Sequence, residues 1–161
     1  MQKQYLTFTL DNTIYAAEVS SVQEVLEYEN PQPLPCPDPV IRGIVRSRGK
    51  SISVINTRRK FGLADCDPGP ETRIIVFEIP DDEQGIVNCV GAIADSVLEV
   101  LEIDTEAIEP PPPAGHSEAS KFITGISDKD SRFIIILDIA KLFSIKELTN
   151  ITSFAEAAKE K

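Results

Sequence analysis

Positively charged side chains gather in one short part of this acidic chain of 161 residues. Residues 41–60 contain no Asp or Glu, although the whole chain has 26 of these acids and a formal net charge of −10. The basic residues of this block are Arg42, Arg46, Arg48, Lys50, Arg58, Arg59 and Lys60. Guanidinium and ammonium groups bind carboxylates, phosphates and carbonyl oxygens. The block therefore either binds an anionic partner or pairs with acids of its own chain.

Residue types that carry out catalysis are scarce. The one histidine, His116, lies in the segment PPPPAGHSEAS, which is typical of a loop, whereas a catalytic histidine needs a positioned partner in an enclosed site. The three cysteines, Cys36, Cys66 and Cys89, are odd in number and widely spaced, which indicates free thiols in a reducing cytosol. No phosphate-binding glycine loop and no nucleophile elbow occurs. We therefore expect a binding protein, not an enzyme, with no metal and no cofactor.

Short β-strands are the main structural signal. In residues 5–10, YLTFTL, the side chains of Leu6, Phe8 and Leu10 alternate with those on the other face, and Asp11-Asn12 can turn the chain into a return strand. Apolar residues in 18–27 recur at three- and four-residue spacing, which predicts a short helical turn that leads into another strand. Residues 72–80 form a nearly continuous apolar run and are predicted to be a strand, and residues 85–103 are predicted to form a strand followed by a second extended piece.

Two hairpins are also predicted. The first spans residues 41–56, with Gly49 in its turn, Ile52 and Val54 on the inward face, and residues 58–60 as a solvated end of the strand. The second spans 122–139, with residues 127–131 as its turn, and residues 139–148 can form a helix at its end. The Pro-rich segment 30–39 is either a rigid connector between strand-rich blocks, which we favour, or a ligand for an SH3 domain.

About nine or ten short strands with few helices indicate an all-β protein built from small closed barrels, which leave few open strand edges. Two packed barrels suit the length better than one sandwich. We expect a single domain over residues 1–148 and a polar tail over 149–161. No apolar run is long enough to cross a bilayer, and the opening residues lack the pattern of a secretory signal, so we expect a cytoplasmic protein.

The segment IRGIVRSRGKSISVINTRRKFG resembles the signature of the CheW-like chemotaxis adaptor family. The matching positions are Ile41, Gly43, Arg48, Gly49, Val54, Arg58, Phe61 and Gly62. Three further segments resemble other parts of that family in the same order: residues 5–27, 88–103 and 122–143. The resemblance covers about residues 5–148, and the order of the four segments is more specific than any one of them.

This resemblance implies two intertwined five-stranded SH3-like β-barrels around a shared core, with a short helix near the first barrel and a C-terminal helix. It implies a non-catalytic adaptor of chemotaxis signal transduction, a two-component system, that works through protein–protein interaction. Its partners would be the cytoplasmic tips of methyl-accepting chemoreceptors and the regulatory domain of the CheA-type histidine kinase. It would be cytoplasmic and recruited to membrane receptor arrays without inserting into the membrane itself.

The resemblance also assigns a receptor-binding set: Val22, Glu24, Gly43 and Arg48. The arginine would form two parallel hydrogen bonds to a carboxylate or carbonyl of the receptor, Val22 would add apolar contact, and Gly43 would permit close approach of two backbones. Arg46 and Arg58 are candidates for the same positive patch. No short motif marks the kinase-binding surface, and its residues stay unassigned.

Each of these residues has a purely structural alternative. Arg48 would simply occupy a hairpin turn, Gly43 would serve a bulge, Val22 would belong to the core and Glu24 would pair with a nearby base. The chain also departs from the family pattern within its most diagnostic strip. The departures are Arg46-Ser47 for Asn-Leu, Ser53 for Pro, and Asn56-Thr57 for Asp-Leu. They add positive charge and favour an altered or dedicated partner.

The main alternative function is a small β-barrel that binds nucleic acid through residues 41–60. Such barrels interleave aromatic residues with basic ones so that bases can stack. The block has no aromatic residue before Phe61, and the net charge opposes a general affinity for nucleic acid. The adaptor is therefore the favoured reading, and no nucleic-acid partner is expected.

Overall fold

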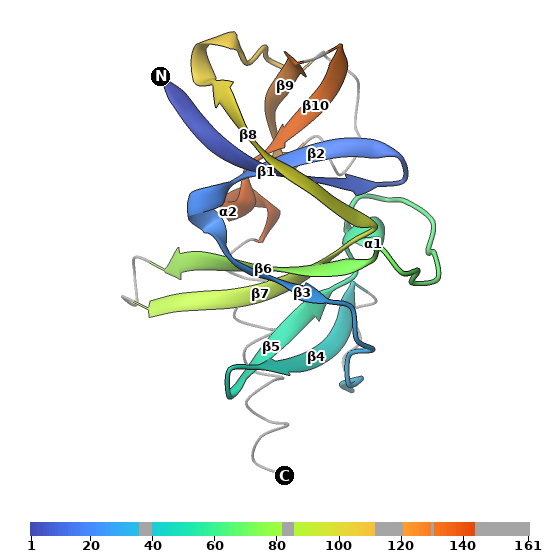
Figure 1. Cartoon of the computed structure of the whole chain (residues 1–161). Coiled ribbons are helices and arrows are strands. Elements are labelled where there is room, and N and C mark those ends of the chain that lie inside the picture. The colour runs from blue at the N-terminus through green and yellow to red at the C-terminus, as the bar shows by residue number, and fades with distance from the viewer. Residues whose placement is uncertain (36–39, 82–85, 112–120, 130, 144–161) are drawn as a thin grey trace.

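Two five-stranded sheets form the protein, and each curls into a barrel (Figure 1). The computed structural model describes residues 1–35, 40–81, 86–111, 121–129 and 131–143. The first barrel has the strand order β8-β1-β2-β10-β9, and the second has the order β3-β6-β7-β5-β4. The strands are β1 Gln2–Leu10, β2 Thr13–Glu18, β3 Val22–Glu27, β4 Ile41–Ser47, β5 Lys50–Ile55, β6 Arg73–Asp81, β7 Ile86–Ala94, β8 Ser96–Asp104, β9 Ile123–Lys129 and β10 Arg132–Leu137. The expectation of two intertwined five-stranded barrels is confirmed.

The chain starts in the first barrel, builds the whole second barrel, and then returns to complete the first. Four short helical segments follow strands β2, β8, β5 and β10 in the described residues. They are the 3-10 turns η1 Val19–Ser21 and η2 Thr105–Ala107, and the α-helical turns α1 Thr57–Lys60 and α2 Ile139–Leu142. The helical turn predicted before β3 is therefore present as η1, beside the first barrel. None of the helices in the described residues is long and apolar enough to cross a membrane.

The two barrels repeat the same hairpin-and-helix unit 82 positions apart, since Ile41 corresponds to Ile123. Both units begin with Ile-x-Gly-Ile, and both end in a capped helical turn, α1 or α2. The backbone N–H of Asn56 donates to the Val40 carbonyl at 2.7 Å, and that of Asp138 donates to the Phe122 carbonyl at the same distance. Each cap side chain also accepts a hydrogen bond from the backbone N–H three residues later.

Each barrel also closes in the same way. The segment that follows β3 pairs with β4 through a bridge between Gln32 and Ile44, and the segment that follows β8 pairs with β9 through a bridge between Glu109 and Ile126. These bridges join the two edge strands of each sheet and so remove the open edges.

The largest core cluster lies between the barrels and takes side chains from both. Its members include Leu6, Phe8 and Leu10 of β1 and Ile75 and Phe77 of β6. A smaller cluster fills each barrel interior. The predicted alternation along β1 and β5 is therefore present, but the second face of these strands is buried as well: Thr7 is 1% exposed and Ser53 is 5% exposed. The shared core explains this double burial.

The expectations for residues 58–60, the last hairpin and the C-terminal helix were met only in part. Residues 57–60 form helix α1, so the prediction that residues 58–60 are a solvated strand end was wrong. The last hairpin turns later than predicted, because β9 continues to Lys129. The predicted C-terminal helix begins at Ile139 and is described up to Leu142. His116, Cys36 and the predicted tail 149–161 lie outside the described residues.

Candidate functional site

Three of the four predicted receptor-binding residues lie where the edge strands of the second barrel meet. We call this line the β3–β4 seam and define it by Glu24, Gln32, Gly43, Ser47 and Arg48. At one end of the seam the backbones of Gln32 and Ile44 exchange two hydrogen bonds, with N···O distances of 2.7 and 2.9 Å. At the other end, side chains make the connection.

Gly43 is required by the backbone end of the seam. It is buried and has φ +145°, and the hydrogen-bond register between β4 and β5 shifts between Ile41 and Gly43. A Cβ atom at this position would lie 2.2 Å from the carbonyl oxygen of Gln32. The close backbone approach expected of this glycine is therefore made within the chain, and the bulge that was its structural alternative is present.

Glu24 accepts contacts at the other end from two consecutive residues of the β4–β5 hairpin. The Ser47 hydroxyl donates a hydrogen bond to Glu24 Oε1 at 2.6 Å. The nearest atom of the Arg48 guanidinium, Nε, lies 3.0 Å from Glu24 Oε2. The Glu24 side chain is only 13% exposed, whereas that of Arg48 is 73% exposed. A partly buried carboxylate thus has both oxygens paired, which offsets its loss of hydration.

The backbone of the hairpin turn is not optimal for stability. Arg48 has φ 52° and Gly49 has φ 77°, so both central residues are left-handed, as two-residue hairpins with the native twist require. Asn-Gly and Asp-Gly are the usual sequences, because other residues cost about 1 kcal/mol or more in this conformation. Arg48 therefore holds a conformation that asparagine or aspartate would adopt at lower cost.

The remaining predicted residues lie in different surroundings. Val22 begins β3 and is half-buried against the shared core. This agrees with its structural alternative, that Val22 belongs to the core. Arg46 is exposed on β4, two residues before Arg48. These positions leave Val22 beside the seam and place Arg46 on the same hairpin as Arg48.

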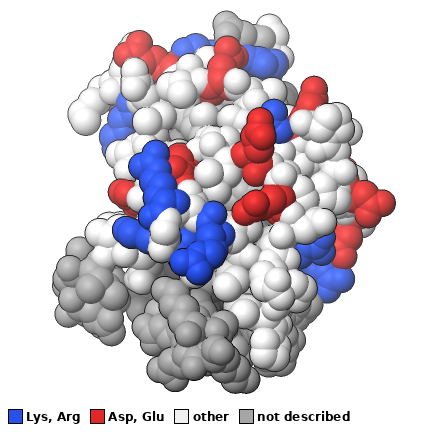
Figure 2. Space-filling view, turned by 60° about the horizontal axis from the view of Figure 1, so that its bottom comes forward, with Lys and Arg blue, Asp and Glu red and all other residues white. Residues whose placement is uncertain are grey.

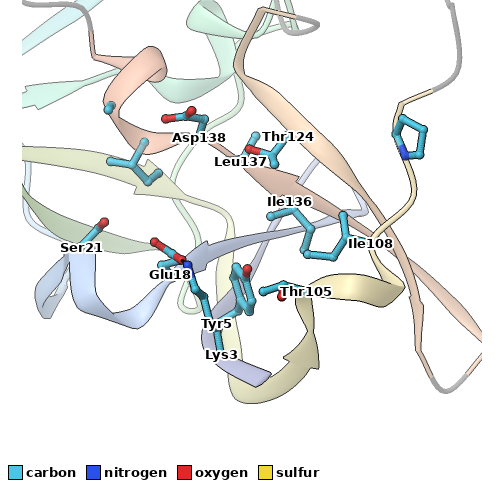
Figure 3. Close-up of a pocket in the computed structure, with 13 residues that line it drawn as sticks. Lys3, Tyr5, Glu18, Ser21, Thr105, Ile108, Thr124, Ile136, Leu137 and Asp138 are labelled. Atoms are coloured by element: carbon cyan, nitrogen blue, oxygen red, sulfur yellow. Dashed lines mark hydrogen bonds and ion pairs between the residues drawn. The ribbon is translucent and has the colours of Figure 1, made fainter. Parts of the chain in front are cut away.

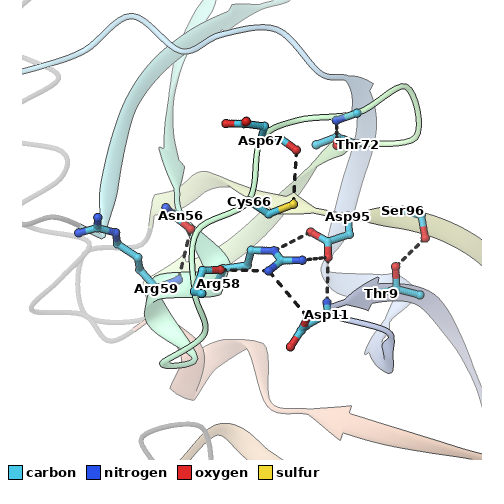
Figure 4. Close-up of polar contacts among 12 residues, drawn as sticks. Thr9, Asp11, Asn56, Arg58, Arg59, Cys66, Asp67, Thr72, Asp95 and Ser96 are labelled. Atoms are coloured by element: carbon cyan, nitrogen blue, oxygen red, sulfur yellow. Dashed lines mark hydrogen bonds and ion pairs between the residues drawn. The ribbon is translucent and has the colours of Figure 1, made fainter.

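Arg58 does not belong to an exposed patch, and this part of the prediction was wrong. Its side chain is 15% exposed and forms a two-pronged contact with Asp95, with Nη2 2.5 Å from Oδ2 and Nε 3.0 Å from Oδ1 (Figure 4). Its Nη1 also donates to the Ala64 carbonyl at 3.0 Å. The backbone N–H of Asp11 donates to Asp95 Oδ2 at 2.8 Å. Burial raises the pKa of Asp95, but these donors outweigh it and the net pKa is below the ordinary value.

Within the described part of the chain, three of the seven basic residues of the block form ion pairs with acids of their own chain. Arg48 contacts Glu24, Arg58 contacts Asp95, and Arg59 lies 2.8 Å from Asp65. Figure 2 shows acidic side chains directly beside the basic ones on the face that it presents. This surface is a mosaic of both charges, in contrast to the basic stripe typical of nucleic-acid binding.

A separate pocket of about 570 Å³ lies at the first barrel, between β1, η1 and α2 (Figure 3). Its charged residues include Lys3 and Glu18, whose side chains form an exposed ion pair at 2.7 Å, and Asp138, which caps α2. Burial raises the pKa of Tyr5 in its wall. Lys3, Glu18 and Asp138 thus make structural contacts at the edge of this pocket.

Two residues of these arrangements were missed at the level of the sequence. Ser47 was noted only as a departure from the family pattern, although a hydroxyl next to an arginine in a turn can reach the same acid. Asp95 gave no local signal, because its partner Arg58 lies 37 positions away.

Comparisons with known proteins agree with the fold. The family model for the CheW-like domain matches residues 4–147. The chemotaxis protein CheW of Treponema pallidum is 28% identical over 94% of this chain and 88% of its own length, and that of Thermotoga maritima is 30% identical over 91% and 89%. The crystal structure of the scaffolding protein TtCheW from Thermoanaerobacter tengcongensis superposes with a TM-score of 0.78 at 33% identity, and covers 91% of this chain and 96% of that one. The chain belongs to the CheW-like domain family.

Proposed function

We propose that this chain is a cytoplasmic adaptor that couples the cytoplasmic tips of chemoreceptors to the regulatory domain of a CheA-type histidine kinase. The coarser part of this function follows from the family, whose relatives are chemotaxis proteins and whose solved relative is a scaffolding protein. The named partners, the absence of catalysis and the recruitment to membrane receptor arrays are parts of the proposal.

The observation that supports receptor binding most directly is that Arg48 is paired with Glu24 and yet largely exposed. Its guanidinium is held at its Nε side by a half-buried acid, while 73% of the side chain stays exposed. The Nη side can therefore donate two parallel hydrogen bonds to a carboxylate or amide oxygen at a receptor tip. Val22 lies beside the seam and supplies apolar contact, and Gly43 acts indirectly by holding β4 against Gln32.

The nucleic-acid alternative receives no support from the comparisons. Among the residues that the structure describes, three of the seven basic residues of the block are also paired with neighbouring acids, which lowers the number of phosphates that the surface could neutralise.

Charge reversal at the seam tests the proposal. Arg48→Glu should abolish binding to a receptor cytoplasmic fragment in a pull-down. The new acid lies beside Glu24 and costs some stability, but the side chain is exposed, so circular dichroism should show the same fold. The matched control is Arg132→Glu, which changes the other barrel's hairpin, where Arg132 forms an exposed ion pair with Glu99 at 3.3 Å. The control should bind as the original chain does. Equal binding by both variants would remove the seam from the receptor site.

Co-purification tests the second partner. The full chain should form a complex with the isolated regulatory domain of the kinase, and Arg48→Glu should leave that complex intact, because the proposal assigns Arg48 to the receptor. A chain that binds the receptor fragment but never the kinase domain would contradict the coupling role.

A further inference from the structure

Ser47 donates a hydrogen bond to one oxygen of Glu24, the acid that forms an ion pair with Arg48. Its hydroxyl lies 2.6 Å from Glu24 Oε1, while Arg48 Nε lies 3.0 Å from the other oxygen, Oε2. The resemblance places an apolar leucine at position 47 of the family pattern, and leucine cannot donate a hydrogen bond. The three-residue arrangement is therefore a feature of this chain's own sequence.

The hydroxyl and the guanidinium bind different oxygens of the same carboxylate. An arginine and a carboxylate often form a two-pronged pair with two parallel hydrogen bonds, and an oxygen of such a pair can still accept a further donor. Asp95 and Arg58 make such a pair in this same molecule, with distances of 2.5 and 3.0 Å. At the seam Ser47 occupies Oε1, and the nearest approach of Arg48 is through Nε to Oε2 alone.

The exposed fractions of the two arginine side chains differ in the same way as their ion pairs. Arg58, in its two-pronged pair, is 15% exposed, whereas Arg48 is 73% exposed. The turn that carries Arg48 is left-handed at two successive residues, which directs this side chain away from the barrel body at an energetic cost.

We propose that Ser47 is a positioning residue that keeps the outer edge of Arg48 free for a partner carboxylate, because its hydrogen bond fixes the orientation in which Glu24 meets Arg48 through Nε. This inference rests on the proposed receptor site and adds to it a specificity device. Without the hydroxyl, Glu24 turns its freed oxygen toward the Nη atoms of Arg48 and the arginine pairs internally. A partner that presents a carboxylate then has to displace Glu24 before it can bind.

Calorimetric titration of the full chain with a receptor cytoplasmic fragment tests this. Ser47→Ala should weaken binding about tenfold, the loss expected for one charge-assisted hydrogen bond. Ser47→Thr keeps the hydroxyl and should restore the original affinity. In a Glu24→Ala background, Ser47→Ala should have no further effect, because the competitor is gone. An unchanged affinity in Ser47→Ala, or the same tenfold loss in the Glu24→Ala background, would overturn the inference.

A second measurement needs no partner. The guanidinium protons of Arg48, observed by nuclear magnetic resonance, should exchange with water more slowly in Ser47→Ala than in the original chain, because Glu24 then covers them. Equal exchange rates would contradict the inference. The two hypotheses fail separately: if the original chain does not bind the fragment, the receptor proposal fails, whereas this exchange experiment still decides the role of Ser47.

Discussion

Asp95 accepts both prongs of the Arg58 guanidinium and, at the same carboxylate, the backbone N–H of Asp11. Arg58 belongs to α1 of the second barrel, Asp11 lies in the β1–β2 turn of the first, and Asp95 lies between β7 and β8, where the chain passes from one barrel to the other. One carboxylate therefore connects three segments across the junction of the barrels.

Replacement of this carboxylate should destabilise the protein in a pH-dependent way. Asp95→Asn should lower the free energy of unfolding at pH 7 by about 1–3 kcal/mol, because Arg58 loses its paired charge. The pKa of Asp95 is lowered in the folded state, so its contribution is present above about pH 4 and is lost as the pH falls through that lowered pKa. The difference between the two proteins in urea titrations should therefore shrink as the pH falls from 7 to 3.

Asp65→Asn is the control for that experiment. Asp65 pairs with Arg59, but both side chains are about half exposed, at 48% and 46%, so solvent screens the pair. Its effect on stability at pH 7 should be much smaller. A constant difference between Asp95→Asn and the original chain at all pH values would contradict the role assigned to the charge.

The closure of the second barrel should depend on Gly43 far more than on Gly49. Gly43→Ala brings Cβ against the Gln32 carbonyl oxygen and should lower the free energy of unfolding by about 3 kcal/mol or more. Gly49→Ala has positive φ but nothing within 4 Å, so about 1 kcal/mol is expected. Thermal and urea unfolding measure both, and equal losses would show that the seam relaxes freely around residue 43.

Thr57→Val should stabilise the protein. Thr57 is 1% exposed, and its hydroxyl has no hydrogen-bond partner among the described residues. Valine has the same shape without the polar atom, and the corresponding residue of the first barrel, 82 positions later, is the apolar Ile139. We expect a gain of about 1 kcal/mol in urea unfolding, because burial of an unpaired hydroxyl is costly. A loss of stability would mean that the hydroxyl is satisfied.

Arg48→Asn should separate binding from stability. Asparagine tolerates the left-handed conformation, so the variant should unfold at the same or a slightly higher urea concentration, with a gain of up to about 1 kcal/mol. Binding of the receptor fragment, measured by calorimetry, should be lost with the guanidinium. If the variant is less stable than the original chain, the Arg48–Glu24 ion pair contributes more to folding than the turn conformation costs.

Much of the fold could be predicted from the sequence because its strands are short and regular. Residues 5–10 have a two-residue period, and both Asp11 and Asn12 adopt the positive φ that their turn requires. The pattern could not show that both faces of β1 are buried, because that depends on β6 and β7 packing beneath it. The repeat at 82 positions is visible in the sequence, because both hairpins begin with Ile-x-Gly-Ile.

The candidate site was predictable only in part. The resemblance indicated Glu24, Gly43 and Arg48, and the structure brings these three to one seam. The sequence could not show that the Arg58 side chain is largely buried. A run of basic residues has the same sequence pattern whether or not the fold brings acidic side chains next to it. Partners that lie 23 and 37 positions apart, such as Ser47 with Glu24 and Arg58 with Asp95, require the fold itself.

The parallel pairing of β2 with β10 sets an order of assembly during translation. Ile14–Ala16 pair with Ile134–Ile136, 120 positions later, whereas all strands of the second barrel lie within residues 22–94. A nascent chain can therefore complete the second barrel before the ribosome has made the strands that pair with its first hairpin, β1–β2. We expect early-released chains to carry one finished barrel and one exposed apolar hairpin, which makes them clients for chaperones.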